Sequence, residues 1–204
     1  VYKRQISSSD TGEATVTNSL TFTSANWDTA QTVTVTGVDD SLLDGSQSSI
    51  VTISVVDQNT SDEFDAVADQ TVSVSTTDDD VAGFTIVEFE GSTEVDESGD
   101  TDTFTVVLDA QPTSDVVITI TSSDTGEATV TSTLTFTPAN WDTPQVATIT
   151  GVDDDIIDGS QTSTITVSID DANSDDDFDA IADQTVSVST TDDDVAGFTV
   201  SETE

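Results

Sequence analysis

The sequence predicts an all-β protein built from tandem β-sandwich repeats, and two patterns carry the prediction. The first is alternation. Runs such as Thr32-Val33-Thr34-Val35 and Thr185-Val186-Ser187-Val188 place an apolar residue at every second position, which is typical of half-buried strands. The second is repetition, because residues 9–17 recur unchanged at residues 123–131, 114 positions later. A period of that length indicates a whole domain and not a solenoid turn.

The repeat also sets the domain boundaries that we expect. Residues 68–85 recur unchanged as residues 182–199, and each copy contains an Asp triplet. With the boundary placed at the triplet, residues 81–194 form one complete repeat and residues 6–80 an incomplete one that lacks its opening strands. Residues 195–204 then form the opening strand of a next repeat. We therefore expect a stretch of a longer array of near-identical modules.

Residues 1–5 stand apart from the repeat. This segment, Val-Tyr-Lys-Arg-Gln, contains both basic residues and the single Tyr of the chain, and it shares nothing with its aligned counterpart, residues 115–119. It resembles the translation of a sequencing-transposon adapter. We expect a non-native segment here, and the alternative is a genuine basic strand.

Within the complete repeat, apolar alternation and turn residues predict eight strands. Turns are indicated at Pro112, Pro138 and Asp158-Gly159. The expected strands cover residues 84–89, 103–108, 116–121, 127–131, 133–137, 145–152, 160–169 and 184–190. Their number, shortness and spacing are typical of an immunoglobulin-like sandwich.

Composition excludes several classes of function. The chain has 42 acidic residues against 2 basic ones and contains neither His nor Cys, giving a formal net charge of -40. It therefore offers no imidazole base, no thiolate and no ordinary zinc site. So much negative charge repels nucleic acid and anionic lipid surfaces. We expect a protein that is not an enzyme and has no nucleic-acid partner, and no stretch is long and apolar enough for membrane insertion.

Clusters of carboxylates recur at matched positions of the two repeats. Two like charges about 4 Å apart cost on the order of 1–4 kcal/mol, and almost no basic side chain is present to neutralise them. Oxygen ligands without nitrogen or sulfur suit Ca²⁺ better than Mg²⁺. The spacing does not fit an EF-hand, since its third and twelfth positions would be Ile156 and Ile165. The alternative for each cluster is a solvated turn. The clusters are Asp39-Asp40 with Asp44, Asp78-Asp79-Asp80, Asp153-Asp154-Asp155 with Asp158, and Asp192-Asp193-Asp194.

The complete repeat resembles the Calx-β domain, the calcium-binding sandwich of sodium–calcium exchangers that also occurs in tandem in bacterial surface proteins. The resemblance rests on residues 150–158, an acidic triplet followed by two apolar residues and an acid, and on the closing strand with its triplet, residues 185–198. It implies Ca²⁺ ligands in the complete repeat at Glu97, Glu127, Asp153, Asp154, Asp158, Asp192, Asp193 and Asp194, and in the incomplete repeat at Glu13, Asp39, Asp40, Asp44, Asp78, Asp79 and Asp80. Gln47 and Gln161 depart from the family, which tends to place an acid there.

These observations predict a calcium-stabilised structural repeat of a large secreted or cell-surface protein. Such a repeat would act as a rigid spacer in an adhesin, an extracellular matrix or a filament. Its partners would be neighbouring repeats, identical chains or surface glycans. An opening strand at residues 195–204 also suggests strand donation between units.

Three alternatives stay open at this point. A calcium-dependent carbohydrate-binding module would use exposed aromatic residues, and Trp27 and Trp141 could stack on sugar rings, although we expect both to pack over the end of a sandwich. A calcium sensor would bind at micromolar and not millimolar Ca²⁺. A glycosidase would need two carboxylates set across a cleft, and no cleft-forming insertion interrupts either repeat.

Overall fold

The computed structural model describes residues 2–56, 62–64 and 66–202. The chain divides into two compact units, Val1–Asp79 (unit 1) and Asp80–Glu204 (unit 2). No helix in the described part of the chain is long and apolar enough to span a bilayer.

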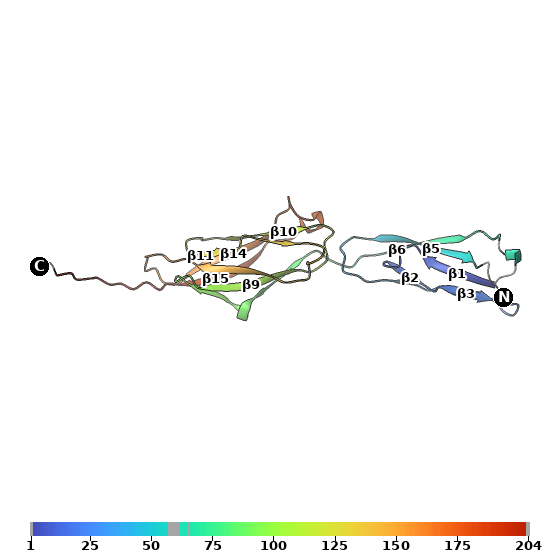
Figure 1. The fold of residues 1–204 in the computed structure, drawn as a ribbon, viewed down its shortest axis with the longest axis horizontal. Helices are drawn as coiled ribbons and strands as arrows, with labels where there is room; N and C mark the ends of the chain where they lie inside the picture. The colour runs from blue at the N-terminus through green and yellow to red at the C-terminus, as the bar shows by residue number, and fades with distance from the viewer. Residues whose placement is uncertain (1, 57–61, 65, 203–204) are drawn as a thin grey trace. The chain divides into compact units, whose positions relative to one another are not determined.

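Unit 2 is a sandwich of two sheets (Figure 1). One sheet has the order β12-β10-β14-β15-β8 and the other the order β11-β13-β9-β7. Neighbouring strands are antiparallel except for β8 and β15, which run parallel. The strands are β7 (Phe84–Glu88), β8 (Thr93–Asp96), β9 (Thr101–Leu108), β10 (Val116–Ser122), β11 (Ala128–Val130), β12 (Thr133–Phe136), β13 (Gln145–Gly151), β14 (Gln161–Ile169) and β15 (Gln184–Thr191).

Alternate side chains of these strands fill the core between the sheets. Phe104 of β9 and Ile149 of β13 are fully buried, as are Phe136 of β12 and Ile165 of β14 from the other sheet. Each such side chain contributes about 1.5–3 kcal/mol by leaving water. The alternation seen in the sequence therefore marks the inner faces of the two sheets.

Unit 1 repeats part of this plan. Its sheet β3-β1-β5-β6 corresponds to β12-β10-β14-β15, and its sheet β2-β4 corresponds to β11-β13. No counterparts of β7, β8 and β9 occur among the described residues of unit 1. The strands are β1 (Tyr2–Ser8), β2 (Ala14–Val16), β3 (Ser19–Phe22), β4 (Val35–Gly37), β5 (Gln47–Val55) and β6 (Gln70–Thr76). Short 3-10 turns lie at Asp62–Phe64 in unit 1 and at Phe89–Gly91 and Asp176–Phe178 in unit 2.

The structure confirms the all-β sandwich class, and each of the eight expected strands matches an observed one. It adds β8, whose four residues are too few for alternation to be visible in the sequence. Thr93 and Val95 of this strand are buried and Glu94 is exposed.

Residues 195–202, which we expected to form an opening strand, are in no strand here. Their repeat counterpart β7 pairs with β9, and a strand needs such a hydrogen-bonding partner. Phe198 is accordingly 91% exposed. Residues 2–5, expected to be non-native, belong to β1 and pair with β3. The Tyr2 ring lies 4.3 Å from that of Phe64.

Candidate metal centre

Three carboxylates meet at one end of the unit 2 sandwich. Glu97 follows β8, Asp154 lies in the loop after β13, and Asp194 follows β15. One carboxylate oxygen from each lies within 4.8 Å of the other two. Residues far apart in the sequence therefore converge because β8, β13 and β15 end at the same pole.

The backbone fixes Glu97 at this pole. Its amide donates to the carbonyl of Thr191 at 3.1 Å, which extends the parallel pairing of β8 with β15. Gly151 permits the close approach of β8 to β13, since a Cβ there would lie 1.9 Å from the carbonyl oxygen of Asp96. The Gly151 amide donates to the carbonyl of Asp100 at 3.0 Å. A glycine in β13 thus leaves room for the backbone that leads into Glu97.

Three carboxylates at this pole carry an oxygen that is buried and has no hydrogen-bond partner. These atoms are Glu97 Oε2, Glu127 Oε2 and Asp194 Oδ2. Glu97 is only 1% exposed, and residues 80–204 contain no Lys, Arg or His. Burying an ionised carboxylate is costly unless a positive charge or hydrogen bonds compensate for it. The chain itself provides no positive side chain for this purpose in unit 2.

The same crowding is visible in the pKa values. Burial raises the pKa of Glu97, and the charges of Asp192 and Asp154 raise it further. Burial followed by the charge of Asp158 raises the pKa of Glu127, and burial followed by the charge of Asp192 raises that of Asp194. A bound cation would act in the opposite direction on all three.

Asp192 organises the loops around the site. Its Oδ2 accepts a hydrogen bond from the Gly159 amide at 2.8 Å, and its Oδ1 accepts one from the Asp194 amide at 2.8 Å. The bond from Gly159, followed by that from Asp194, lowers the pKa of Asp192. Gly159 has a φ of 74°, a conformation that favours glycine. Asp154 likewise accepts a bond at Oδ1 from the amide of Ile156.

Sequence-predicted ligands of unit 2 therefore fall into separate groups. Glu97, Asp154 and Asp194 share one small volume, and Glu127 has a buried oxygen at the same pole. Asp153, Asp158 and Asp193 are exposed and lie outside the group of three.

The corresponding pole of unit 1 has the same loops without a counterpart of Glu97. Asp78 Oδ2 accepts hydrogen bonds from the amides of Asp44 and Gly45, at 3.2 and 2.8 Å. Asp40 Oδ1 accepts one from Leu42. Burial and then the charge of Asp44 raise the pKa of Glu13. Among the residues that the structure describes, unit 1 has no group of three carboxylates close enough to share an ion.

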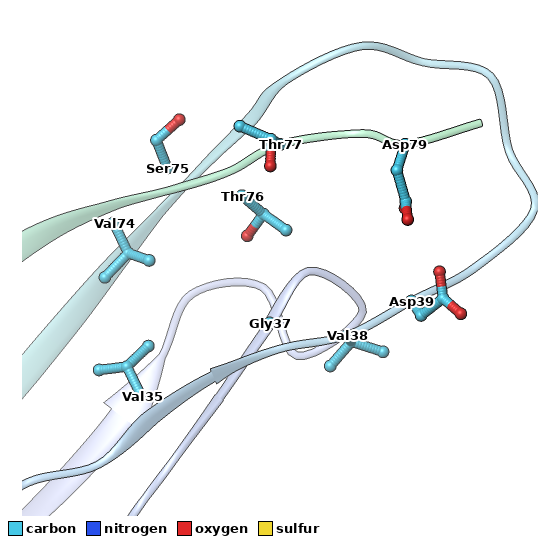
Figure 2. A pocket seen from close by; sticks show the side chains of 9 residues that line it. All are labelled: Val35, Gly37, Val38, Asp39, Val74, Ser75, Thr76, Thr77 and Asp79. Carbon is cyan, nitrogen blue, oxygen red and sulfur yellow. The ribbon is translucent and has the colours of Figure 1, made fainter. Parts of the chain in front are cut away.

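Three predicted ligands remain. Asp39 and Asp79 are exposed and line a groove of unit 1 (Figure 2), and Asp80 belongs to unit 2.

No pattern in the sequence indicates a role for Asp175, which is 5% exposed. Its Oδ2 accepts hydrogen bonds from the backbone amides of Thr113 and Ser114, each at 2.8 Å, and from the Thr113 hydroxyl at 2.7 Å. Burial works against ionisation, but the bonds from Thr113, Ser114 and Asp177 outweigh it and lower the pKa of Asp175. Pro112 indicates a turn at residues 111–114, but it does not indicate that Asp175 binds the amides of that turn.

The two Trp residues differ in exposure. Trp141 is half-buried, and its carbonyl accepts a hydrogen bond from the amide of Leu108 at the end of β9. Trp27 is 72% exposed, so the expectation that it packs over the sandwich end is wrong. Unit 1 has no described strand equivalent to β9 to cover that end.

Compared with models of known protein families and with curated proteins, the chain matches none of them. Solved structures similar to it include domains 4 and 5 of the S-layer protein SbsC, at 18% identity and a TM-score of 0.41, covering 92% of this chain and 70% of that one. Domains 4–9 of SbsC match at 18% identity and a TM-score of 0.43, covering 98% of this chain and 23% of that one. The apo form of the Calx CBD1 domain matches at 16% identity and a TM-score of 0.37, covering 54% of this chain and 98% of that one. The β-sandwich assignment itself rests on the sheets described above.

Proposed function

We propose that unit 2 binds Ca²⁺ through Glu97, Asp154 and Asp194, and that the chain is a calcium-stabilised structural repeat. The observation that carries the proposal is the Glu97 carboxylate, which is 1% exposed and has an unpartnered Oε2. It faces two further carboxylates with an oxygen within 4.8 Å. A cation bound between the three carboxylates would compensate for the buried negative charge.

The donor set fits calcium. Ca²⁺ binds six to eight oxygens at about 2.3–2.6 Å, so ligand oxygens on opposite sides of one ion lie about 5 Å apart. The 4.8 Å limit on the three carboxylates falls within that span. Mg²⁺ demands a stricter octahedron and gives up its water reluctantly. Backbone carbonyls and water would complete the coordination, because three carboxylates alone supply too few ligands.

The role follows from what the ion would join. Asp194 ends the closing Asp triplet after β15, Asp154 lies after β13, and Glu97 follows β8. One ion would therefore tie three chain segments together and fix the direction in which the chain leaves the sandwich. Metal ions would stabilise the fold in place of disulfides, since the chain has no Cys. This supports a rigid spacer in a secreted or cell-surface protein such as an adhesin, a matrix protein or a filament.

Isothermal titration of the full chain with CaCl₂ after treatment with EDTA tests the proposal. We expect saturable binding, weaker binding of Mg²⁺, and loss of the tightest site in Glu97→Gln. The matched control is Glu94→Gln, on the exposed face of the same strand β8, which should bind Ca²⁺ as the unchanged chain does. Equal binding by both variants would contradict the assignment of Glu97.

The spacer role has its own test. The ion would order the residues that leave the sandwich after Asp194. Backbone order parameters of residues 195–200, measured by NMR relaxation on the full chain, should be higher in Ca²⁺ than in EDTA, and Glu97→Gln should remove the difference. Order parameters that do not change with Ca²⁺ would argue against a calcium-stiffened spacer.

A further inference from the structure

The outer face of the sheet β11-β13-β9-β7 in unit 2 carries an apolar patch. Val87 of β7 is 57% exposed, Val146 of β13 is 54% exposed, and Phe89, which follows β7, is 62% exposed. Thr105 of β9 pairs with Val87 on one side and with Val146 on the other. Directly paired residues lie on the same face of a sheet, so these side chains form one row. Exposed apolar side chains that gather in one place mark contact surfaces, whereas scattered ones are ordinary.

An open pocket lies at one end of this row. Its volume is about 250 Å³, and its lining includes Phe89, Glu90, Thr103 and Thr105. The first two belong to the 3-10 turn after β7, which is drawn in green beside β9 in Figure 1, and the other two belong to β9. The pocket therefore combines an aromatic ring, a carboxylate and two hydroxyls on an otherwise exposed sheet face.

The backbone of the turn is unfavourable for a residue with a side chain. Glu90 has a φ of 54°, the only positive value of a non-glycine residue in the described part of the chain, and Gly91 follows with a φ of 83°. Glycine adopts such a conformation most readily. The repeat that begins after β15 nevertheless also has a Glu at this sequence position, Glu204. A Glu is thus kept where the backbone alone would favour glycine, which points to a use of its side chain.

The fold does not require the apolar side chains of the patch. In the sequence of the next repeat, 114 positions later, Ser201 and Thr203 stand in place of Val87 and Phe89. The buried Phe84 of the same strand is, in contrast, unchanged in that copy. The patch is therefore a feature of this particular repeat and not of the sandwich.

The charge of the chain selects a cationic occupant for the pocket. The formal net charge is -40, and residues 80–204 contain no Lys, Arg or His. A field of that sign attracts cations and repels anions. A second copy of the repeat has no cation to offer, since residues 6–204 contain no basic side chain. The occupant must therefore come from a different, basic molecule.

We propose that this pocket binds an arginine side chain of a basic partner protein. A guanidinium group stacks on aromatic faces and pairs with carboxylates through two parallel hydrogen bonds. Phe89 provides the aromatic face and Glu90 the carboxylate, while the hydroxyls of Thr103 and Thr105 can accept further N–H groups. The aliphatic stem of the arginine would pack on Val87, which also lines the pocket.

An NMR titration of the isotope-labelled full chain with the peptide acetyl-Gly-Arg-Gly-amide tests the inference. Ca²⁺ is present to compete for the acidic pole, and physiological ionic strength screens long-range attraction. We expect saturable shift changes at the amides of residues 87–90 and 103–105. The matched probe replaces the arginine with citrulline, which has the same shape without the charge, and it should not bind. Shift changes confined to other residues, or equal changes with the citrulline peptide, would overturn the proposal.

Two variants and one control separate this pocket from general attraction to an acidic chain. Phe89→Thr introduces the residue of the next repeat at an exposed position, and it should weaken binding about two- to fivefold through loss of the cation–π contact. Glu90→Gln should weaken it by a similar factor. Glu94→Gln removes the same charge from an exposed position of β8 and should leave the affinity unchanged. Unchanged affinity in Phe89→Thr, or an equal loss in Glu94→Gln, would contradict the assignment.

A neutral oligosaccharide tests the other ligand class that a ring and hydroxyls could receive. Maltotriose should cause no shift change at residues 87–90. If maltotriose binds there and the arginine peptide does not, the pocket is a sugar site and the proposal is wrong. The arginine site is independent of the proposed Ca²⁺ site, so Glu97→Gln should bind the peptide as the unchanged chain does.

Discussion

Units 1 and 2 share most of their sequence and differ in what covers their inner faces. Val35, Val72 and Trp27 of unit 1 are exposed. Their counterparts in unit 2, Ile149, Val186 and Trp141, lie beneath or beside β8 and β9. Glu97 lies between these two strands, at the acidic pole. The segment from β7 to β9 therefore supplies both the part of the core that unit 1 lacks and the buried carboxylate of Glu97. The comparison shows that three carboxylates come within reach of one ion only in the unit whose β8 places the buried Glu97 beside the acidic loops.

The largest effect is expected where the core differs most. Ile149→Ala should cost unit 2 about 2–5 kcal/mol, because it empties a fully buried position, and Val35→Ala should cost unit 1 less than about 1 kcal/mol. Urea unfolding followed by Trp fluorescence measures both. A Trp27→Phe background leaves Trp141 as the reporter of unit 2, and Trp141→Phe leaves Trp27 for unit 1. Similar costs at the two positions would show that the groove is covered in solution.

A second contrast concerns the paired glycines. Gly151→Ala should destabilise unit 2 by about 1–3 kcal/mol, since its Cβ would collide with the backbone after Val95. Gly37→Ala should change the stability of unit 1 by no more than about 0.5 kcal/mol, because the nearest atom to its Cβ would be Thr76 Cγ2 at 3.7 Å. The same fluorescence reporters apply. A large cost at Gly37 would mean that the groove already holds a neighbouring backbone.

Asp175 offers a contrast that depends on pH. The hydrogen bonds that lower its pKa stabilise the folded state, so their contribution is complete above the ordinary Asp pKa of about 4 and is lost as the pH falls below it. Asp175→Asn should cost about 1–3 kcal/mol at pH 7 and progressively less below about pH 4. Unfolding of variant and unchanged chain across pH measures the difference. A cost independent of pH would indicate a packing effect and not an ionic one.

The smallest effect is expected at the end of the chain. Phe198 is 91% exposed, so Phe198→Ser should leave the stability of unit 2 within about 0.5 kcal/mol of the unchanged chain. A loss of more than that, measured by urea unfolding with Trp141 as reporter, would show that residues 195–202 pack against the sandwich.

Much of this fold could be predicted from the sequence because the alternation that marks a strand is local and because the repeat sets the domain boundaries. The eight expected strands of unit 2 depend on local patterns such as Thr185-Val186-Ser187-Val188. β8 was missed because its pairing with β15 joins residues almost a hundred positions apart, and the sequence shows only Thr-Glu-Val-Asp. Asp175 was missed for the same reason, since its partners Thr113 and Ser114 are distant in the chain.

The sequence could predict which residues belong to the candidate site, but not what each residue does within it. Carboxylate clustering and the resemblance to a calcium-binding family named Glu97, Asp154 and Asp194 together with residues that stay exposed, such as Asp153 and Asp193. Sequence could not show that Asp192 accepts bonds from the loop amides and is thereby an organiser of the site. Which oxygen is buried and unpartnered depends on tertiary packing alone.

The most direct test of the central claim is thermal unfolding of the two single-Trp variants in EDTA and in Ca²⁺. If free Ca²⁺ is about 100 times the dissociation constant, binding adds about 2.7 kcal/mol, which corresponds to a rise in Tm of about 10 °C for a domain of this size. We predict that rise for the Trp141 transition, its loss in Glu97→Gln, and little change in the Trp27 transition. An equal rise in both transitions, or none in either, would contradict the claim that the buried Glu97 makes the calcium site of unit 2.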